Sequence, residues 1–209
     1  MTYGEVKTLF SGLLNRRDNT PALTETFMQN SMLRLQRSLR VPAMERSVGY
    51  TIPASTYDGV IIPSDFLELI SLSDTANAYE LTRTSLANAL KYAVILGGEP
   101  RVFARRDARW VVGPTPSTGT VIRIDYYATF EELSADGDES IVTQIFPDAL
   151  MYGALSLACD FYLDKRHDVF EQRYLNIVAA IQEQADMDEL SGISQVAACN
   201  PYPHEEDCG

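Results

Sequence analysis

Metal binding is one chemistry that the side chains of this sequence could support, because three possible soft ligands lie close together near its end. Cys199, His204 and Cys208 follow one another at spacings of five and four residues, and Cys159 could supply a fourth ligand. These spacings match no common zinc module, and the sequence contains no C-x-x-C pair. We therefore expect no metal site and interpret the three residues as part of a polar tail.

Catalysis has little support from the residues available. The chain contains two histidines, His167 and His204. It has no glycine-rich phosphate or dinucleotide motif, no G-x-S-x-G elbow and no H-E-x-x-H pair. His167 falls in a charged joint between two predicted helices, where we expect a solvated side chain rather than a general base. The sequence predicts a protein that is not an enzyme and holds no cofactor.

Arginines gather in one β-rich stretch and allow two interpretations. With neighbouring aromatic side chains they could hold phosphates and stack on bases. Acidic residues adjoin them, however, and both arginine and tryptophan are favoured where subunits meet. We favour an interface between subunits over a phosphate site. The predicted interface residues are Arg101, Arg105, Arg106, Arg109 and Trp110.

Acidic residues outnumber basic ones, and the excess is uneven. The net charge is −12, and residues 131–209 alone carry 17 acidic and three basic residues. This balance opposes nucleic-acid binding, which depends on cations at the phosphates. It fits either simple solubility or a surface that must not stick to nucleic acid. Within the segment 131–139 the carboxylates lack the spacing of a calcium loop, so a solvated loop is favoured.

Apolar residues at helical spacing predict helices at both ends of the chain. The first runs from about Tyr3 to Asn15, and the second starts at Pro21, with Thr20 as its N-cap, and stops at Val41. A third starts at Pro147 and is apolar around most of its circumference, which is typical of the centre of a bundle. The pattern Asp168-x-x-Glu171 predicts a capping box at the start of the last helix.

Short β-rich runs separated by glycine and proline fill the middle of the chain. We therefore predict an α+β fold, in which helices from residues 1–45 and 140–190 form a bundle and residues 46–139 form an inserted, antiparallel sandwich-like or barrel-like domain. Residues 191–209 are expected to be a frayed end or an extended arm that orders on a partner. A short helix is expected over Ser85–Lys91. The predicted strands are Ser47–Ile52, Gly59–Ile62, Leu67–Leu72, Arg101–Arg105, Arg109–Val112 and Thr120–Tyr127.

Several segments, in order, resemble the head-to-tail adaptor (connector) proteins of tailed phages, most of all those of short-tailed phages. Ile62-Pro63-Ser64 followed by Asp65–Leu69 is similar to the family's "IPSDFLEL" element. The similarity covers residues 3–190 and no motif after Ser191. The other matching segments are Tyr3–Val6, Gly98–Arg106, Trp110–Pro116, Tyr126-Tyr127 with Leu133, and Phe146–Leu155.

The resemblance implies a structural protein of the virion, made in the host cytoplasm and placed at the head–tail junction, the neck. Such adaptors form a ring, with twelve copies expected, below the portal protein. The ring extends the channel for passing genomic DNA without binding it specifically, and it carries tail, nozzle or tail-fibre proteins. No membrane partner is expected. A different neck, head-completion or tail-terminator protein, or a small non-viral binding module, remains an alternative.

The resemblance also gives roles to two groups of residues. The C-terminal arm is expected to bind the portal through Val196, Pro201, Tyr202 and Pro203. Because a negatively charged wall repels phosphates, the acidic segment is expected to contribute to the DNA channel. The channel residues implied are Glu131, Glu132, Asp136, Asp138 and Glu139.

Overall fold

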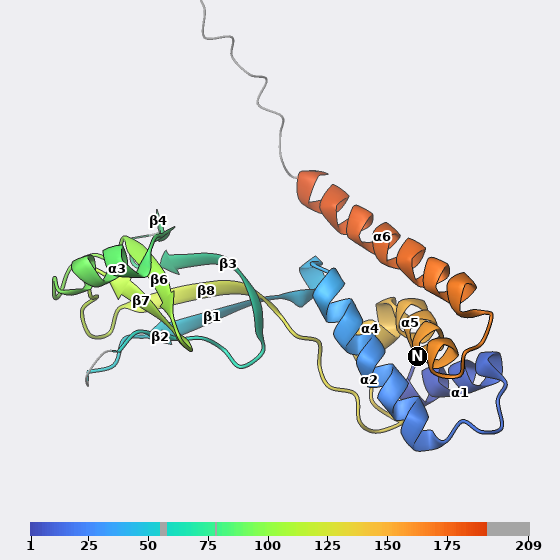
Figure 1. Ribbon diagram of the computed structural model, residues 1–209. Helices are drawn as coiled ribbons and strands as arrows, with labels where there is room; N and C mark the ends of the chain where they lie inside the picture. The colour runs from blue at the N-terminus through green and yellow to red at the C-terminus, as the bar shows by residue number, and fades with distance from the viewer. Residues whose placement is uncertain (55–57, 78, 192–209) are drawn as a thin grey trace, which may run out of the picture.

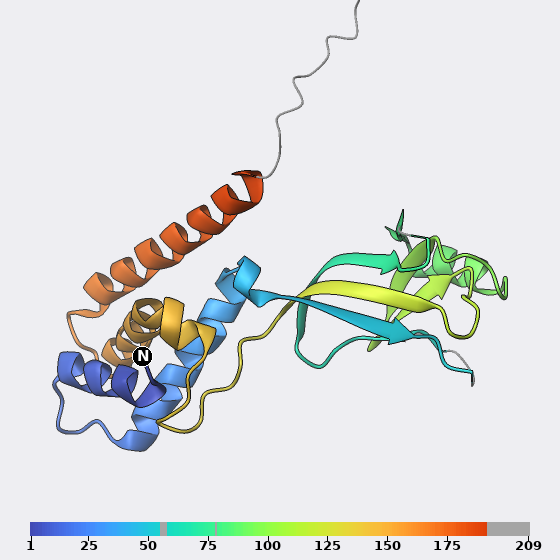
Figure 2. The same cartoon turned by 180° about the vertical axis from the view of Figure 1, so that it is seen from behind.

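Two hydrophobic cores divide the protein into two lobes. The computed structural model describes residues 1–54, 58–77 and 79–191. In this part of the chain, helices from both ends surround one core, and two sheets enclose the other (Figure 1). The predicted mixed α+β class is therefore confirmed. Figure 2 shows from behind that the long strands of the β lobe lead out of the helical lobe.

The helical lobe combines segments that are far apart in the sequence. Thr20 caps the backbone N–H of Leu23, and Pro21 occupies the first turn of its helix, as predicted. Asn15 ends the first helix in the left-handed conformation. The lobe consists of α1 (Tyr3–Leu14), α2 (Pro21–Ser38), the 3-10 turn η1 (Pro42–Met44), α4 (Ile141–Ile145), α5 (Pro147–Phe161) and α6 (His167–Ser191).

Helix α5 lies among the other helices, in agreement with its apolar circumference. It contacts α1, α2, α4 and α6. Leu150, Leu155 and Cys159 are fully buried on it. Gly153 faces α2 and α6 at close range, because an added Cβ would meet the Ser31 hydroxyl and would lie 3.0 Å from a ring carbon of Tyr174. The missing side chain therefore sets the distance between α5, α2 and α6.

The start of α6 differs from the prediction. The helix begins at His167, and the Asp164 carboxylate accepts a hydrogen bond from the Arg166 backbone N–H at 3.0 Å. The capping box expected at Asp168 is wrong because Glu171 faces another helix. It accepts hydrogen bonds from the Arg34 guanidinium of α2 at 2.7 and 3.2 Å. His167 is half-buried rather than solvated, and its Nδ1 lies 3.2 Å from the Ser156 carbonyl oxygen.

The β lobe is a sandwich of two four-stranded sheets. Their strand orders are β1-β8-β3-β4 and β2-β7-β6-β5, and all pairs are antiparallel except β5 with β6. Alternate side chains of the long strands fill the space between the sheets. The elements are β1 (Glu45–Thr51), β2 (Val60–Ile61), β3 (Phe66–Asp74), β4 (Tyr79–Glu80), β5 (Thr82–Arg83), α3 (Leu86–Ala93), β6 (Val102–Arg106), β7 (Arg109–Gly113) and β8 (Val121–Ala128).

The chain leaves the sandwich earlier than predicted. After Ala128, Phe130 and Leu133 are buried in the helical core rather than in the sheets. The following turn docks on the start of α1, where the backbone N–H of Gly4 donates to the Asp136 carbonyl at 2.9 Å. Residues 130–139, expected to belong to the inserted domain, therefore pack with the helical lobe, because their apolar side chains face helices.

Candidate functional site

Reactive side chains are dispersed in the part of the chain that the structure describes. Among residues 1–54, 58–77 and 79–191, no three of His, Cys, Asp or Glu gather as a metal site would require. Cys159 is buried within α5, and this burial raises the pKa of its thiol. Cys199, His204 and Cys208 fall outside the described residues. Over the same described ranges, no helix is long and apolar enough to span a bilayer.

The arginines of the predicted interface lie on one sheet of the β lobe, but they differ in their surroundings. Arg101 is exposed and pairs with Glu99 at 2.8 Å. Arg106 pairs with Asp58, and the Arg105 Nε donates to the Asp107 carbonyl at 3.2 Å. The role of these arginines, and of the half-buried Arg109, at a subunit interface stays a prediction.

Trp110 differs from the arginines because its side chain faces the sandwich core. It is 3% exposed, and its ring meets that of Phe66 edge-on at 5.2 Å. Because the indole is buried within its own chain, it offers almost no surface to a neighbouring subunit. Near it, Arg83 and Arg105 lie beside a cavity of about 210 Å³ that Trp110, Phe66 and Phe103 also line. The carboxylate-bearing Glu68 lines the same cavity, so its charges are mixed.

Two members of the acidic segment shape its own turn. The Asp138 carboxylate accepts hydrogen bonds from the backbone N–H groups of Ala135 at 2.8 Å and Ser134 at 2.9 Å. These two donors lower the pKa of Asp138 because they favour its charged form. Asp136 forms an ion pair with Lys7 of α1. The Asp138 carboxylate thus stabilises the turn itself, and the Asp136 carboxylate holds the turn against α1.

The other three acidic residues are exposed. Glu131 lies 3.6 Å from Arg46, and Glu139 accepts a hydrogen bond from Gln144 at 3.0 Å. Glu132 is exposed beside the junction of the lobes. Arg46 offsets part of the charge of Glu131, and the channel assignment of these residues stays a prediction.

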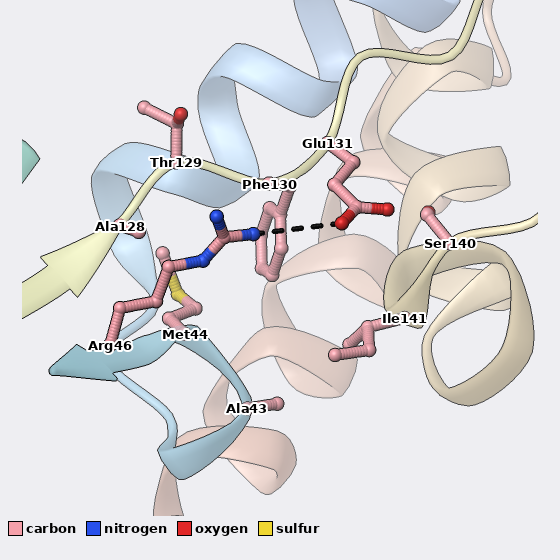
Figure 3. Close-up of a pocket in the computed structure, with 9 residues that line it drawn as sticks. All are labelled: Ala43, Met44, Arg46, Ala128, Thr129, Phe130, Glu131, Ser140 and Ile141. Atoms are coloured by element: carbon pink, nitrogen blue, oxygen red, sulfur yellow. Dashed lines mark ion pairs between the residues drawn. The ribbon is translucent and has the colours of Figure 1, made fainter. Parts of the chain in front are cut away.

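A small pocket marks the junction between the lobes. It holds about 60 Å³ and lies where β1 and the end of β8 approach α4. Figure 3 shows the Arg46 guanidinium reaching past Phe130 toward Glu131, with Ser140, the N-cap of α4, and Ile141, its first residue, on the opposite side. The pocket is lined by Ala43, Met44, Arg46, Ala128, Thr129, Phe130, Glu131, Ser140 and Ile141.

Arg46 also belongs to a polar chain that ties the junction to the sandwich. Its guanidinium lies 3.4 Å from Asp65, which in turn accepts a hydrogen bond from the Tyr126 hydroxyl at 2.9 Å. Burial of Tyr126, together with that hydrogen bond to Asp65, raises the pKa of its phenol to about 12. Asp65, the aspartate of the segment Ile62–Leu69, thus links the start of β3 to β1 and β8.

Replacing Tyr126 by phenylalanine is expected to lower the free energy of unfolding by about 1 kcal/mol, because Asp65 loses a buried donor. The hydroxyl contributes fully below pH 10, and its contribution is lost as the pH rises through 12, since the fold favours the neutral phenol. Urea unfolding at pH 7 and above pH 10 measures both effects. Tyr50→Phe, a half-buried control against the same core, should change stability little; an equal loss there would contradict the role given to Asp65.

The sequence interpretation overlooked an exposed apolar segment that begins in the last turn of α3 and continues past its end. Tyr92, Val94, Ile95 and Leu96 are 44%, 79%, 53% and 79% exposed, and we call these four residues the apolar tip. Thr115 holds this loop in place, with its backbone N–H 2.9 Å from the Ile95 carbonyl oxygen. The signal was present in the sequence, as an uninterrupted Val-Ile-Leu run directly before a Gly-Gly turn.

A groove in the helical lobe also went unpredicted. It holds about 540 Å³ between α2 and the segment that follows β8. Buried apolar side chains form its floor, and polar or charged side chains form its rim. We call it the α2 groove and define it by Met28, Met32, Leu33, Phe130, Glu132 and Leu133. Methionines make such a floor adaptable to the shape of an incoming apolar side chain.

A family model matches the sequence over both lobes. The family described as SU10 adaptor protein matches residues 1–197. That range includes all the helices and strands of the described chain and extends six residues past the end of α6. No curated protein matches the sequence significantly.

Proposed function

Since the chain belongs to the SU10 adaptor protein family, a family of phage head-to-tail adaptors, we propose that it forms a ring, of twelve copies, between the portal and the tail. Membership implies a structural role at the neck of a phage virion and association with portal and tail proteins. The ring, its copy number and its attachment to both neighbours are the parts that we propose. In that ring the protein extends the DNA channel and carries the tail components.

The family match over residues 1–197 carries this proposal, because it spans both lobes and not one motif. The division into two cores adds physical support. An adaptor must hold one partner at each end, and lobes with separate cores can present separate surfaces. We propose that the helical lobe faces the portal and the β lobe faces the tail.

The test is direct imaging of the protein with its partner. Purified full-length chain mixed with portal rings of the same phage should give, by electron microscopy, a second ring stacked coaxially on the portal. Portal rings without added density, or a compact monomer that binds a small ligand, would overturn the adaptor assignment. A ring of different symmetry bound elsewhere on the virion would instead identify another neck protein.

We propose that residues 191–209 bind the portal through Val196, Pro201, Tyr202 and Pro203, which lie outside the residues that the structure describes. Deleting 191–209 should abolish co-sedimentation with portal rings while the circular dichroism of the helices persists, because both cores lie within residues 1–190. The full-length variant V196S with Y202S keeps the chain length and removes two of the proposed contacts, so it should also bind more weakly. Binding by the deleted chain at full strength would contradict this role.

We propose that the exposed carboxylates of residues 131–139 repel DNA in the channel. Replacing Asp136 and Glu139 with lysine should slow DNA ejection, because lysines at the wall attract phosphates, and the delay should shrink as salt increases. Ejection from virions carrying the variant is timed by the release of genome-bound dye. The control variant D136N with E139Q removes the same two carboxylates without adding positive charge. It therefore separates the attraction of lysine to DNA from the loss of local contacts. Equal ejection times for the lysine variant and the natural protein would remove the channel role.

A further inference from the structure

The turn that joins α5 to α6 contains a leucine at a position that usually holds glycine. The backbone N–H of Asp164 donates to the Cys159 carbonyl at 2.8 Å, and that of Leu163 donates to the Asp160 carbonyl at 3.1 Å. These two hydrogen bonds form the Schellman motif, in which the residue after the C-cap is left-handed and most often glycine. Here that residue is Leu163, with a φ of 54°. A bulky side chain therefore occupies a backbone conformation that disfavours it.

The other left-handed positions carry residues that suit this conformation. Among the described residues other than glycine, only Asn15 at the end of α1 and Asp107 in the β6–β7 turn share a positive φ with Leu163. Asparagine and aspartate adopt this conformation more readily, because their short polar side chains can form hydrogen bonds with the nearby backbone. Leucine has no such compensation, so the turn itself would be more stable with asparagine at position 163.

The Leu163 side chain gains nothing from burial within its own chain. It is 90% exposed, the highest value among the large apolar side chains of the described residues. Phe161, two residues earlier, is 59% exposed, and Leu13 on the adjoining end of α1 is 42% exposed. We call Leu13, Phe161 and Leu163 the helical-end cluster. An apolar residue that is both strained and exposed is explained if a second molecule covers it.

Hydrogen bonds hold the helical-end cluster in place. The Arg166 guanidinium donates to the carbonyl oxygens of Leu13 and Leu14 at 3.1 and 3.0 Å, and thereby ties the turn to the end of α1. The same guanidinium donates to the Asp164 carboxylate at 2.8 Å. Because the backbone that carries these side chains is already fixed, a partner that covers them has less conformational entropy to overcome.

The cluster lies at one end of the molecule. In Figures 1 and 2 the α5–α6 turn and the end of α1 lie on the side of the helical lobe that is farthest from the β lobe. With the β lobe facing the tail, as proposed above, this end points toward the portal. A ring neighbour is related by rotation about the channel axis, so it adjoins the sides of a chain rather than its end.

We propose that the helical-end cluster inserts into an apolar pocket of the portal protein and is one of the contacts that hold the ring on the portal. The inference rests on the proposed function, because it names a surface for the portal contact that this function requires. It adds to the binding proposed for residues 191–209, since the cluster lies within the described helical lobe and the two contacts can be altered separately.

Photo-cross-linking tests which molecule covers position 163. Leu163→Cys is made in a full-length chain whose Cys199 and Cys208 are replaced by serine, and benzophenone maleimide is attached to it. The remaining Cys159 is fully buried and is not expected to react. The labelled chain is bound to portal rings and irradiated, and the products are identified by mass. We expect a product that joins one adaptor chain to one portal chain.

The matched control carries the same label at the opposite end of the molecule. Val94 in the apolar tip is 79% exposed, so Val94→Cys should give no portal product in the same rings. A product that joins two adaptor chains through position 163, or bound rings without any portal product from it, would overturn the inference while the adaptor function stands. A portal product from Val94→Cys alone would reverse the proposed orientation of the lobes and would overturn the inference as well.

Substitution of Leu163 should change binding and stability in opposite directions. Leu163→Asn suits the left-handed turn, so the urea midpoint of the helical lobe should rise. Its affinity for portal rings, measured by co-sedimentation, should fall by at least about tenfold, which corresponds to the loss of one buried leucine side chain. A side chain that supports the fold would instead lower the midpoint when it is removed. A lower midpoint or an unchanged portal affinity would overturn the inference.

Asn15→Gly is the matched control for the backbone. It replaces another left-handed residue at the same end of the helical lobe but removes no apolar side chain, so its portal affinity should equal that of the natural protein. An equal loss of affinity in Asn15→Gly and Leu163→Asn would show that the backbone, and not the leucine side chain, governs binding, and would overturn the inference. Failure of the natural protein to bind portal rings would overturn the proposed function together with it.

Discussion

Replacing Gly153 by valine is expected to lower the free energy of unfolding of the helical lobe by about 3 kcal/mol, through overpacking at a site with no room for a side chain. A Cβ at this position would displace the Ser31 hydroxyl, which donates to the Leu150 carbonyl at 2.8 Å, and would press on Tyr174. Urea unfolding followed by circular dichroism at helical wavelengths measures the loss. We expect α2 and α6 to be pushed away from α5 in any variant that still folds.

Two further variants make the Gly153 prediction specific. Gly12 lies on the exposed side of α1 with nothing near the position of an added Cβ, so Gly12→Ala should raise stability by about 0.5–1 kcal/mol through helix propensity. Ser31→Ala removes the hydroxyl that an added side chain at position 153 would meet first. The double variant should therefore lose less free energy of unfolding than the two single variants lose in total. If the two losses in free energy of unfolding simply add, the valine at position 153 is not strained against Ser31.

Removing the carboxylate of Glu171 is expected to cost about 2 kcal/mol, because it leaves the half-buried Arg34 without its charged partner. The Arg34 guanidinium makes two hydrogen bonds to Glu171 and stacks 4.4 Å from the centre of the Tyr174 ring, and the Ser156 hydroxyl also donates to this carboxylate. Glu171→Ala should therefore lower the free energy of unfolding far more than Glu183→Ala, an exposed control on the same helix.

The effect of Glu171 depends on pH in a defined direction. Hydrogen bonds from Arg34, and then from Ser156, lower the pKa of this carboxyl below its usual value of 4.5. Its contribution is complete above pH 4.5 and is lost as the pH falls through the lowered pKa of the folded state. The difference between Glu171→Ala and the natural protein should thus be constant from pH 7 to 5 and shrink below pH 4.5. A difference that grows in acid would contradict the ion pair.

The elements with strong local signals were predictable from the sequence. The Thr20-Pro21 start of α2 and the apolar circumference of α5 depend on neighbouring residues alone, so the pattern was sufficient. Six of the strands were located for the same reason, since each lies in a β-rich run between turn residues. The two-residue strands β4 and β5 were missed, because they lie outside any such run and form only where other strands already provide the partners.

The features that the sequence did not predict correctly depend on tertiary contacts. Asp168 and Glu171 have the spacing of a capping box, but the long-range pairing of Glu171 with Arg34 and the Asp164 turn decide where α6 begins. Trp110 has the composition of an interface anchor, yet alternation along β7 directs its ring into the sandwich. The Val-Ile-Leu run of the apolar tip is visible in the sequence, but only the fold shows that nothing in the described chain covers it.

The chain enters and leaves the sandwich at neighbouring positions. Glu45, the first residue of β1, is paired with Tyr127 near the end of β8. The two crossings between the lobes are therefore one strand spacing apart, and a short bridge between them would leave the helical lobe topologically intact. The β lobe can therefore be exchanged by recombination for another insert whose ends lie equally close together, while the core of the helical lobe stays unchanged.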